Sequence, residues 1–364
     1  MTLDFGLGTN SGRERSDMDI ESLSRDSARS LPSVAAPPPA DGLLRLDSNT
    51  NLFGPNPAIR RVLEREAAGD FALYPAPMHD ALRGAIAARH GLDTAEILVG
   101  AGADELIDVA VRAFVNPGEP VVVAVPTFEL YSFCARVEDA RVVEVPLLKD
   151  FALDADAVLK AGGKLTFIAS PNNPTGNAHP AAALERVIRG SRGIVVIDEA
   201  YAEFCGQDVL HRIREFPNLV VLRTFSKAHG LAGLRVGYAA ARREVIECLA
   251  RVKMPFSVGA LSERIAVEAL ADDGHVRRSR ELVLAEKPSL TEKLAALGLR
   301  PYPTDANFML VQVGASLERL VRHLAGRGIV VRALPKLLDG CMRVTIGRRE
   351  HNERLVKALG EFTR

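Results

Sequence analysis

The chain has 364 residues, a length that predicts two or more lobes rather than one compact core. Hydrophobic residues make up 47% and charged residues 25%, as is typical of a soluble globular protein. Lys plus Arg and Asp plus Glu both total 46, so the charge balance favours neither a nucleic-acid partner nor an anionic membrane. No segment has the pattern of a signal peptide or a membrane-spanning helix, and we expect a cytoplasmic protein. The four cysteines are scattered without metal-binding spacing, so we expect no metal site.

Four parts follow one another along the chain. Residues 1–40 are rich in Ser, Arg, Asp and Gly without an apolar period, which predicts a flexible extension. We expect residues 41–70 to pack beside a smaller lobe. Residues 71–255 are predicted to form a large α/β lobe, and residues 256–364 a small α+β lobe.

The large lobe alternates short apolar runs with helical patterns, which predicts a mostly parallel, buried sheet flanked by helices. Its expected strands and helices are Val121–Val125, Arg141–Val145, Leu165–Ala169, Ile194–Ile197 and Leu219–Leu222, with helical patterns at Ala157–Ala161 and Ala181–Arg189. In the small lobe we expect a long helix over Ser262–Leu297, strands at Phe308–Val313, Ile329–Arg332 and Met342–Ile346, and helices at Leu317–Arg327 and Arg349–Phe362.

Polar side chains follow two of these strands. Asp198 and Tyr201 come after the run that ends at Ile197, and Lys227 comes after the run that ends at Leu222. If the two strands lie close together, these side chains converge at one edge of the sheet, where open α/β sheets bind ligands. A neutral lysine amine can form an imine, a carboxylate can keep a pyridine nitrogen protonated, and a tyrosine can hold a phenolic oxygen. The trio therefore indicates pyridoxal phosphate, with Lys227 as the Schiff-base lysine.

Other segments supply candidates for the rest of such a cofactor. Small residues before a helix let a phosphate approach the free N–H groups and the helix dipole, while hydroxyls and a guanidinium add donors. The candidates for the phosphate are Gly102, Ala103, Asp104, Thr224, Ser226 and Arg235. Asn173, in a turn after a strand, could hydrogen-bond the phenolic oxygen. Phe128 could lie flat on the pyridine ring, and a core position is its alternative.

Together the motifs resemble the fold-type I pyridoxal-phosphate enzymes, aminotransferase class I/II, over roughly residues 43 to 362. Within that group they are most similar to the histidinol-phosphate aminotransferase branch. The segments that carry this resemblance are Gly102–Glu105, Ser170–Gly176, Arg223–Tyr238, Ala306–Phe308 and Arg343–Gly347.

The resemblance implies a role for each candidate. Lys227 would hold the cofactor and shuttle a proton, Asp198 would pair with the pyridine nitrogen, and Asn173 with Tyr201 would hold the phenolic oxygen. Ala103, Asp104, Thr224, Ser226 and Arg235 would occupy phosphate-site positions. The resemblance also implies that Tyr74 reaches the cofactor phosphate of a second subunit, and hence a homodimer. Asn51, Arg332 and Arg343 would contact the substrate, the two arginines at its anionic groups.

One segment departs from the branch. Asn49–Pro55 reads Asn-Thr-Asn-Leu-Phe-Gly-Pro where the branch usually has Asn-Glu-Asn-Pro-Tyr-Gly-Pro, so Thr50 replaces an acid and Leu52 a proline. This segment borders the expected substrate pocket, and three functions stay open. They are transamination of histidinol phosphate with 2-oxoglutarate, transamination of another amino acid such as an aromatic one, and a lyase similar to threonine-phosphate decarboxylase. A binding protein without activity would be expected to lack Lys227 or Asp198, and both are present.

Overall fold

The computed structural model describes residues 19–31, 42–66, 72–334 and 338–363. The chain divides into two units, residues 1–37 and 38–364. In the first unit, the described residues contain a short 3₁₀ helix, η1 (Glu21–Leu23), and a short helix, α1 (Asp26–Arg29). Most of the predicted extension, residues 1–40, lies outside the described residues.

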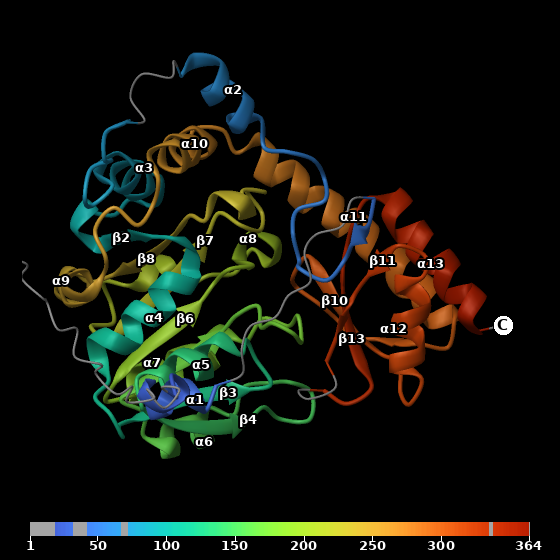
Figure 1. The fold of residues 1–364 in the computed structure, drawn as a ribbon, viewed down its shortest axis with the longest axis horizontal. Helices are drawn as coiled ribbons and strands as arrows, with labels where there is room; N and C mark the ends of the chain where they lie inside the picture. The colour runs from blue at the N-terminus through green and yellow to red at the C-terminus, as the bar shows by residue number, and fades with distance from the viewer. Residues whose placement is uncertain (1–18, 32–41, 67–71, 335–337, 364) are drawn as a thin grey trace, which may run out of the picture. The chain divides into compact units, whose positions relative to one another are not determined.

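The larger part of the second unit is built on a seven-stranded sheet with the order β2-β8-β7-β6-β5-β3-β4 (Figure 1). Its strands are β2 (Ile97–Gly100), β3 (Pro120–Val125), β4 (Arg141–Pro146), β5 (Leu165–Ala169), β6 (Ile194–Asp198), β7 (Leu219–Thr224) and β8 (Gly237–Ala241). All neighbouring pairs are parallel except those of β8, which runs antiparallel to both β2 and β7. The predicted α/β class with a mostly parallel sheet is confirmed.

Helices cover both faces of this sheet, which explains why its central strands are apolar throughout. Neighbouring residues point to opposite faces, so Val196 belongs to one hydrophobic core and Ile197 to the other. The core around Val196 includes residues of α4 (Gly102–Phe114), α5 (Leu130–Val137) and α9 (Arg243–Val252). The core around Ile197 includes residues of α3 (Asp80–His90), α6 (Ala155–Ala161), α7 (Ala181–Gly190) and α10 (Ala260–Leu270).

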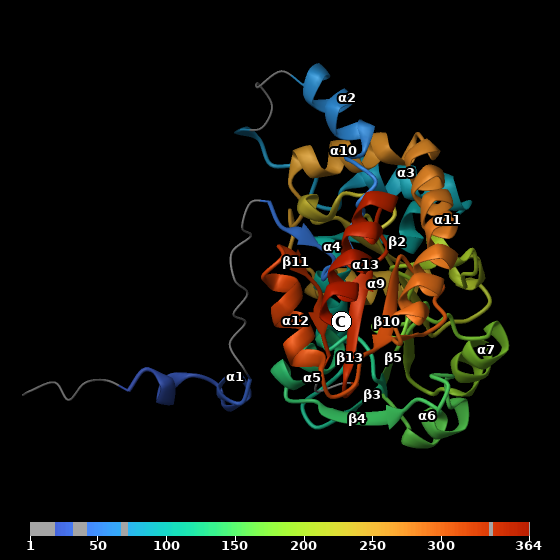
Figure 2. The ribbon, with the colours of Figure 1, turned by 90° about the vertical axis from the view of Figure 1, so that its right-hand side faces the viewer.

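A second lobe follows along the chain. Its antiparallel sheet has the order β12-β13-β10-β9, formed by β9 (Arg300–Pro301), β10 (Phe308–Gln312), β12 (Arg332–Ala333) and β13 (Cys341–Thr345). Helices α11 (Gly274–Ala296), α12 (Leu317–Ala325) and α13 (Arg349–Thr363) belong to the same lobe, and α12 and α13 lie on the side of β10 and β13 away from the first lobe (Figure 1). Figure 2 looks onto this helical layer.

The segment before the first lobe contributes to both lobes. Strand β1 (Leu44–Arg45) pairs in parallel with β11 (Ile329–Val330), and Leu46 is buried in the core of the second lobe. Helix α2 (Pro57–Arg65) instead lies against α10, where Arg61 Nε contacts Glu268 Oε1 at 2.6 Å. The connection between them, residues 46–56, therefore crosses from one lobe to the other.

The prediction of one long helix over Ser262–Leu297 is wrong, because two helices occupy this range. α10 ends at Leu270 and α11 begins at Gly274. The Gly274 amide donates to Asp272 Oδ1 at 2.8 Å, and such a local side-chain bond competes with helix continuation. Among the described residues, no helix is long and apolar enough to cross a membrane.

Candidate active site

The carboxyl ends of β3, β5, β6 and β7 surround a cavity of about 420 Å³, and the rest of its wall comes from the start of α4, residues 232 and 235, the second lobe and residues 47–50. Twelve of the predicted site residues line it: Ala103, Asp104, Phe128, Asn173, Asp198, Tyr201, Thr224, Ser226, Lys227, Arg235, Arg332 and Arg343. Asp47, Ser48, Thr127 and Tyr131 also line the cavity and were not predicted, while Asn49 and Thr50 line it as part of the segment that was expected to border the substrate pocket. The structure thus brings most of the candidates to one place.

Asp198 is the last residue of β6 and is almost fully buried. Its Oδ2 accepts a hydrogen bond from the Tyr131 hydroxyl at 2.6 Å, and its Oδ1 accepts one from the Ala200 amide at 3.0 Å. Burial raises the pKa of the Asp198 carboxyl, while these two donors oppose that rise by stabilising the charged form. The result is a fixed, desolvated carboxylate, which suits the recognition of a cationic ring nitrogen.

Tyr131 belongs to the first turn of α5 and is fully buried. Its ring stacks on Phe167 of β5, with centroids 4.8 Å apart and planes 4° apart, and Phe128 meets its edge at 5.7 Å. Phe128 lies three residues earlier, just before α5, and its carbonyl accepts the Tyr131 amide at 3.3 Å. Tyr131 was not among the predicted residues.

Lys227 lies three residues beyond the end of β7 and is half-buried. Its Nζ donates to the Ser48 carbonyl at 3.1 Å and stands 5.7 Å from the ring centroid of Tyr201. The Tyr201 hydroxyl in turn accepts from Asn49 Nδ2 at 3.0 Å. Residues 48 and 49 therefore hold the side chains of Lys227 and Tyr201 in the wall of the cavity.

Small residues and donors gather where α4 begins. Gly102 has φ +82°, and a Cβ placed on it would stand 2.6 Å from Arg235 Nη2, so only glycine leaves room for that guanidinium. Arg235 Nη2 contacts Asp104 Oδ2 at 2.8 Å, and its Nη1 donates to Ser226 Oγ at 3.4 Å. The Ser226 amide donates to Thr224 Oγ1 at 3.1 Å. Hydroxyls, a guanidinium and helix-terminal N–H groups together form a donor set that fits a phosphate.

The second lobe adds two guanidinium groups to the cavity wall. Arg343 of β13 stands opposite Arg332 of β12 in the strand register. The Arg343 side chain donates from Nη1 to Asn173 Oδ1 and from Nη2 to the Asp47 carbonyl. Burial lowers the pKa of the Arg343 guanidinium, and the positive charge of Arg332 acts in the same direction. An anion bound beside both arginines would relieve this repulsion.

Three predicted residues do not line the cavity. Gly102 lies directly behind Arg235, as described above. The Asn51 amide points away toward α11 and donates to the Ala228 carbonyl at 3.0 Å and to Ser279 Oγ at 2.8 Å. Tyr74 has 84% of its surface exposed, and its ring meets Phe256 at 5.0 Å. Its predicted contact is with a second subunit and stays a prediction.

The chain was compared with known proteins. The family model described as aminotransferase class I and II matches residues 41–359. A histidinol-phosphate aminotransferase from Roseiflexus castenholzii is 42% identical over 336 residues, covering 89% of this chain and 90% of that protein. One from Thermococcus gammatolerans is 42% identical over 322 residues, covering 88% and 92%.

Solved structures agree with the sequence matches. The histidinol-phosphate aminotransferase from Sinorhizobium meliloti, in complex with pyridoxal-5'-phosphate, has a TM-score of 0.85 and 26% identity, covering 97% of this chain and 98% of that one. The L-threonine-O-3-phosphate decarboxylase from Porphyromonas gingivalis, at 23% identity and a TM-score of 0.79, shares the fold. These findings confirm the predicted family resemblance and the predicted cofactor. The chain therefore belongs to the aminotransferase class I and II family of pyridoxal-phosphate enzymes.

Proposed function

We propose that this protein transfers the amino group of histidinol phosphate to 2-oxoglutarate. The observation that carries the choice of substrate is the facing pair Arg332 and Arg343 on one wall of the cavity. The amino donor carries a phosphate and the acceptor carries carboxylates, and planar guanidinium groups bind both kinds of anion. Relatives at 42% identity that are named for this reaction support the same choice.

The remaining residues would hold the cofactor. When bound, pyridoxal phosphate supplies a carbonyl that takes up the amino group and a ring that withdraws electrons from the substrate Cα. Thr224, Ser226, Arg235 and the first turn of α4 would bind its phosphate through the donors described above. Asp198 would accept the pyridine N–H, and its two hydrogen bonds favour the ionised form that this contact needs.

Lys227 would perform the covalent and proton-transfer work. Its amine lies near the Tyr201 ring in the wall of the cavity, where it could attach to the cofactor and then move a proton to and from the substrate Cα. The Tyr201 hydroxyl already accepts from Asn49 Nδ2, so its own proton is free to point at a phenolic oxygen. Asn173, held through Arg343, would reach the same oxygen with its amide.

A panel of amino donors tests the proposal. Histidinol phosphate, histidinol and phenylalanine would each be offered with 2-oxoglutarate, and glutamate formation measured. We expect histidinol phosphate to be preferred, and Arg332→Gln to lower kcat/KM for it by about tenfold or more while leaving phenylalanine little changed, since a hydrogen bond to a charged group contributes about 1.5–3 kcal/mol. A preference for phenylalanine, or CO2 release from O-phosphothreonine, would contradict it.

The proposal includes a cytoplasmic homodimer. Leu73, Tyr74, Met254 and Phe256 are exposed large apolar side chains, and three of them line one shallow pocket: Leu73, Tyr74 and Phe256. Exposed apolar patches of this kind mark interaction sites. Tyr74→Ser should lower the dimer fraction in sedimentation and weaken cofactor binding together. A variant that stays dimeric and binds the cofactor normally would argue against a shared site.

A further inference from the structure

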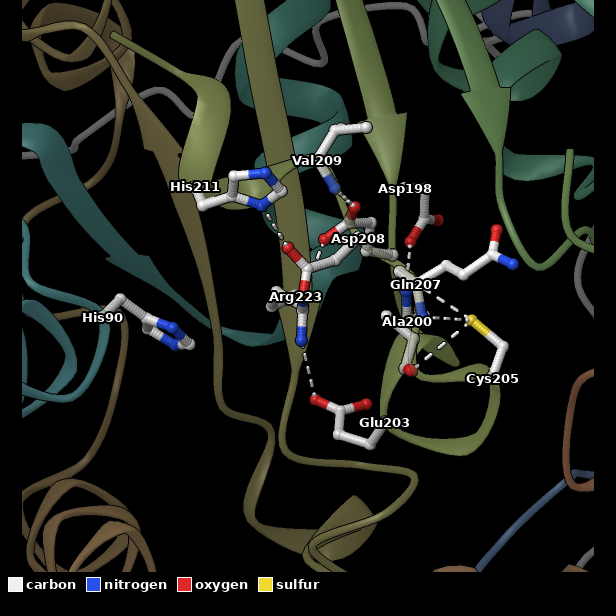
Figure 3. Close-up of polar contacts among 12 residues, drawn as sticks. His90, Asp198, Ala200, Glu203, Cys205, Gln207, Asp208, Val209, His211 and Arg223 are labelled. Carbon is white, nitrogen blue, oxygen red and sulfur yellow. Dashed lines mark hydrogen bonds and ion pairs between the residues drawn. The ribbon is translucent and has the colours of Figure 1, made fainter. Parts of the chain in front are cut away.

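An ionic cluster around the buried Arg223 and Glu199 joins the ends of β6 and β7, and Figure 3 shows the contacts of Arg223 with Glu203 and Asp208. Arg223, the next-to-last residue of β7, contacts Glu199 Oε2 from both Nε and Nη2 at 2.8 Å. The same guanidinium contacts Glu203 Oε1 at 3.3 Å and Asp208 Oδ2 at 3.2 Å. Glu199 also accepts the Val209 amide at 2.5 Å through its other oxygen. Three carboxylates thus share one guanidinium.

The cluster lies on the face of the sheet opposite the cavity residues. Asp198 is paired with Leu222 in the strand register, and the Glu199 amide donates to the Leu222 carbonyl at 2.9 Å. Because side chains alternate along a strand, Asp198 points toward α5 while Glu199 and Arg223 point to the other face. The contact between Glu199 and Arg223 therefore ties the two strand ends one residue away from Asp198 and from Thr224.

Stability alone does not explain this arrangement. A buried ion pair is commonly no more stabilising than well-packed apolar side chains of similar volume, because both charges lose their water. Burial raises the pKa of Glu199 to about 7 and also raises that of Glu203, and the guanidinium opposes both shifts. Among the described residues, Glu203 Oε2 has no hydrogen-bond partner. The cluster therefore carries an electrostatic cost that an apolar contact would avoid.

We propose that Glu199 and Arg223 are positioning residues that set the distance between Asp198 and the Thr224–Lys227 segment. That distance determines where the cofactor ring would lie relative to the phosphate site. The inference rests on the proposed function of this cavity. Asp198 would bind the ring nitrogen of the cofactor and Thr224 with Ser226 its phosphate. Asp198 ends β6 and Thr224 ends β7, so the two binding groups belong to different strands. Two N–H groups of Arg223 contact Glu199 Oε2 while the Val209 amide donates to Oε1, so the carboxylate is held at both of its oxygens and resists rotation.

The test compares variants of the full chain. Glu199→Ala removes the pair, Glu199→Gln keeps its shape and one acceptor oxygen, and Arg223→Lys keeps the charge but loses the two-pronged contact. Glu96→Ala is the matched control, because Glu96 is a buried carboxylate bound by Arg214 at 2.6 Å and does not line the cavity. The readouts are the cofactor dissociation constant, the visible circular dichroism of the bound cofactor and the melting temperature of the apo protein.

We expect Glu199→Ala to weaken cofactor binding by about tenfold or more and to reduce the dichroism, as outer partners of binding groups usually do. Arg223→Lys should fall in between, and Glu199→Gln should stay within about threefold of the wild type. Glu96→Ala should lower the melting temperature only. Unchanged binding and dichroism in Glu199→Ala would overturn the inference; if that variant does not fold, unchanged values in Arg223→Lys would do so. A wild type that binds no cofactor would overturn the proposed function as well.

Discussion

The hydrogen bond from Tyr131 to Asp198 provides a sharp test of how the site holds its carboxylate. Tyr131→Phe removes one oxygen and leaves the stacked ring on Phe167 in place. The O···O distance of 2.6 Å is that of a charge-assisted bond, and such a bond contributes about 1.5–3 kcal/mol. Because this hydrogen bond lowers the pKa of Asp198, its loss should raise that pKa further. A carboxylate that protonates more easily holds a ring N–H⁺ less well.

The expected consequence is a fall in kcat of about 10- to 100-fold, because each 1.36 kcal/mol of lost transition-state stabilisation is about a factor of ten. The KM for the amino donor should change little, since Tyr131 is not a substrate contact in the proposal. Steady-state kinetics would be measured on cofactor-saturated enzyme. The matched control is Tyr302→Phe, a tyrosine whose ring packs on Phe151 and which does not line the cavity. A Tyr131→Phe enzyme with a kcat equal to that of the control would refute the reasoning.

Further predictions concern the phosphate site, the anion site and the pH dependence of stability. Gly102→Ala should weaken cofactor binding, as measured by equilibrium dialysis. The new Cβ would displace Arg235 Nη2, and the φ of +82° at this position disfavours residues other than glycine. An affinity equal to that of the wild type would count against the assigned phosphate site. Arg343→Lys should raise the KM for 2-oxoglutarate by at least the factor by which it lowers kcat, since one ammonium cannot make the two contacts of the guanidinium. An unaltered KM would exclude Arg343 from acceptor binding. Burial lowers the pKa of His179 from 6.5 to about 4, so the unfolded chain takes up this proton first and stability is lost as the pH falls from 6.5 toward 4. Between pH 7 and 4.5, urea unfolding of the apo protein should show a loss in the free energy of unfolding that is about 2 kcal/mol larger for the wild type than for His179→Gln, since His90 and His229 contribute to the loss in both. An equal loss in both would contradict the assignment.

The positions of the main site residues were predictable because they follow strands with strong local signals. The runs before Asp198 and Lys227 are apolar and β-branched, and parallel strands place their carboxyl ends at one edge. The antiparallel strand β8 was missed because it contains three consecutive alanines, which are uncommon in strands. Its place between β2 and β7 depends on tertiary packing.

Other parts of the site depend on contacts between distant segments. Tyr131 meets Asp198 across 67 positions of sequence, and Ser48 meets Lys227 across 179. Hydrogen bonds of this kind leave no periodic pattern in the sequence. Asn51 is a predicted site residue that does not line the cavity. Its segment borders the cavity, but its side-chain amide points away from it and donates to the Ala228 carbonyl and to Ser279 Oγ.

The most direct test of the central claim is to trap the cofactor on its lysine. The protein would be incubated with pyridoxal phosphate, reduced with borohydride, digested, and its peptides weighed by mass spectrometry. We predict one modified peptide, carrying the reduced cofactor on Lys227, and no such peptide from Lys227→Ala. Modification of another lysine instead, or of none, would contradict the assignment of Lys227 and the mechanism built on it.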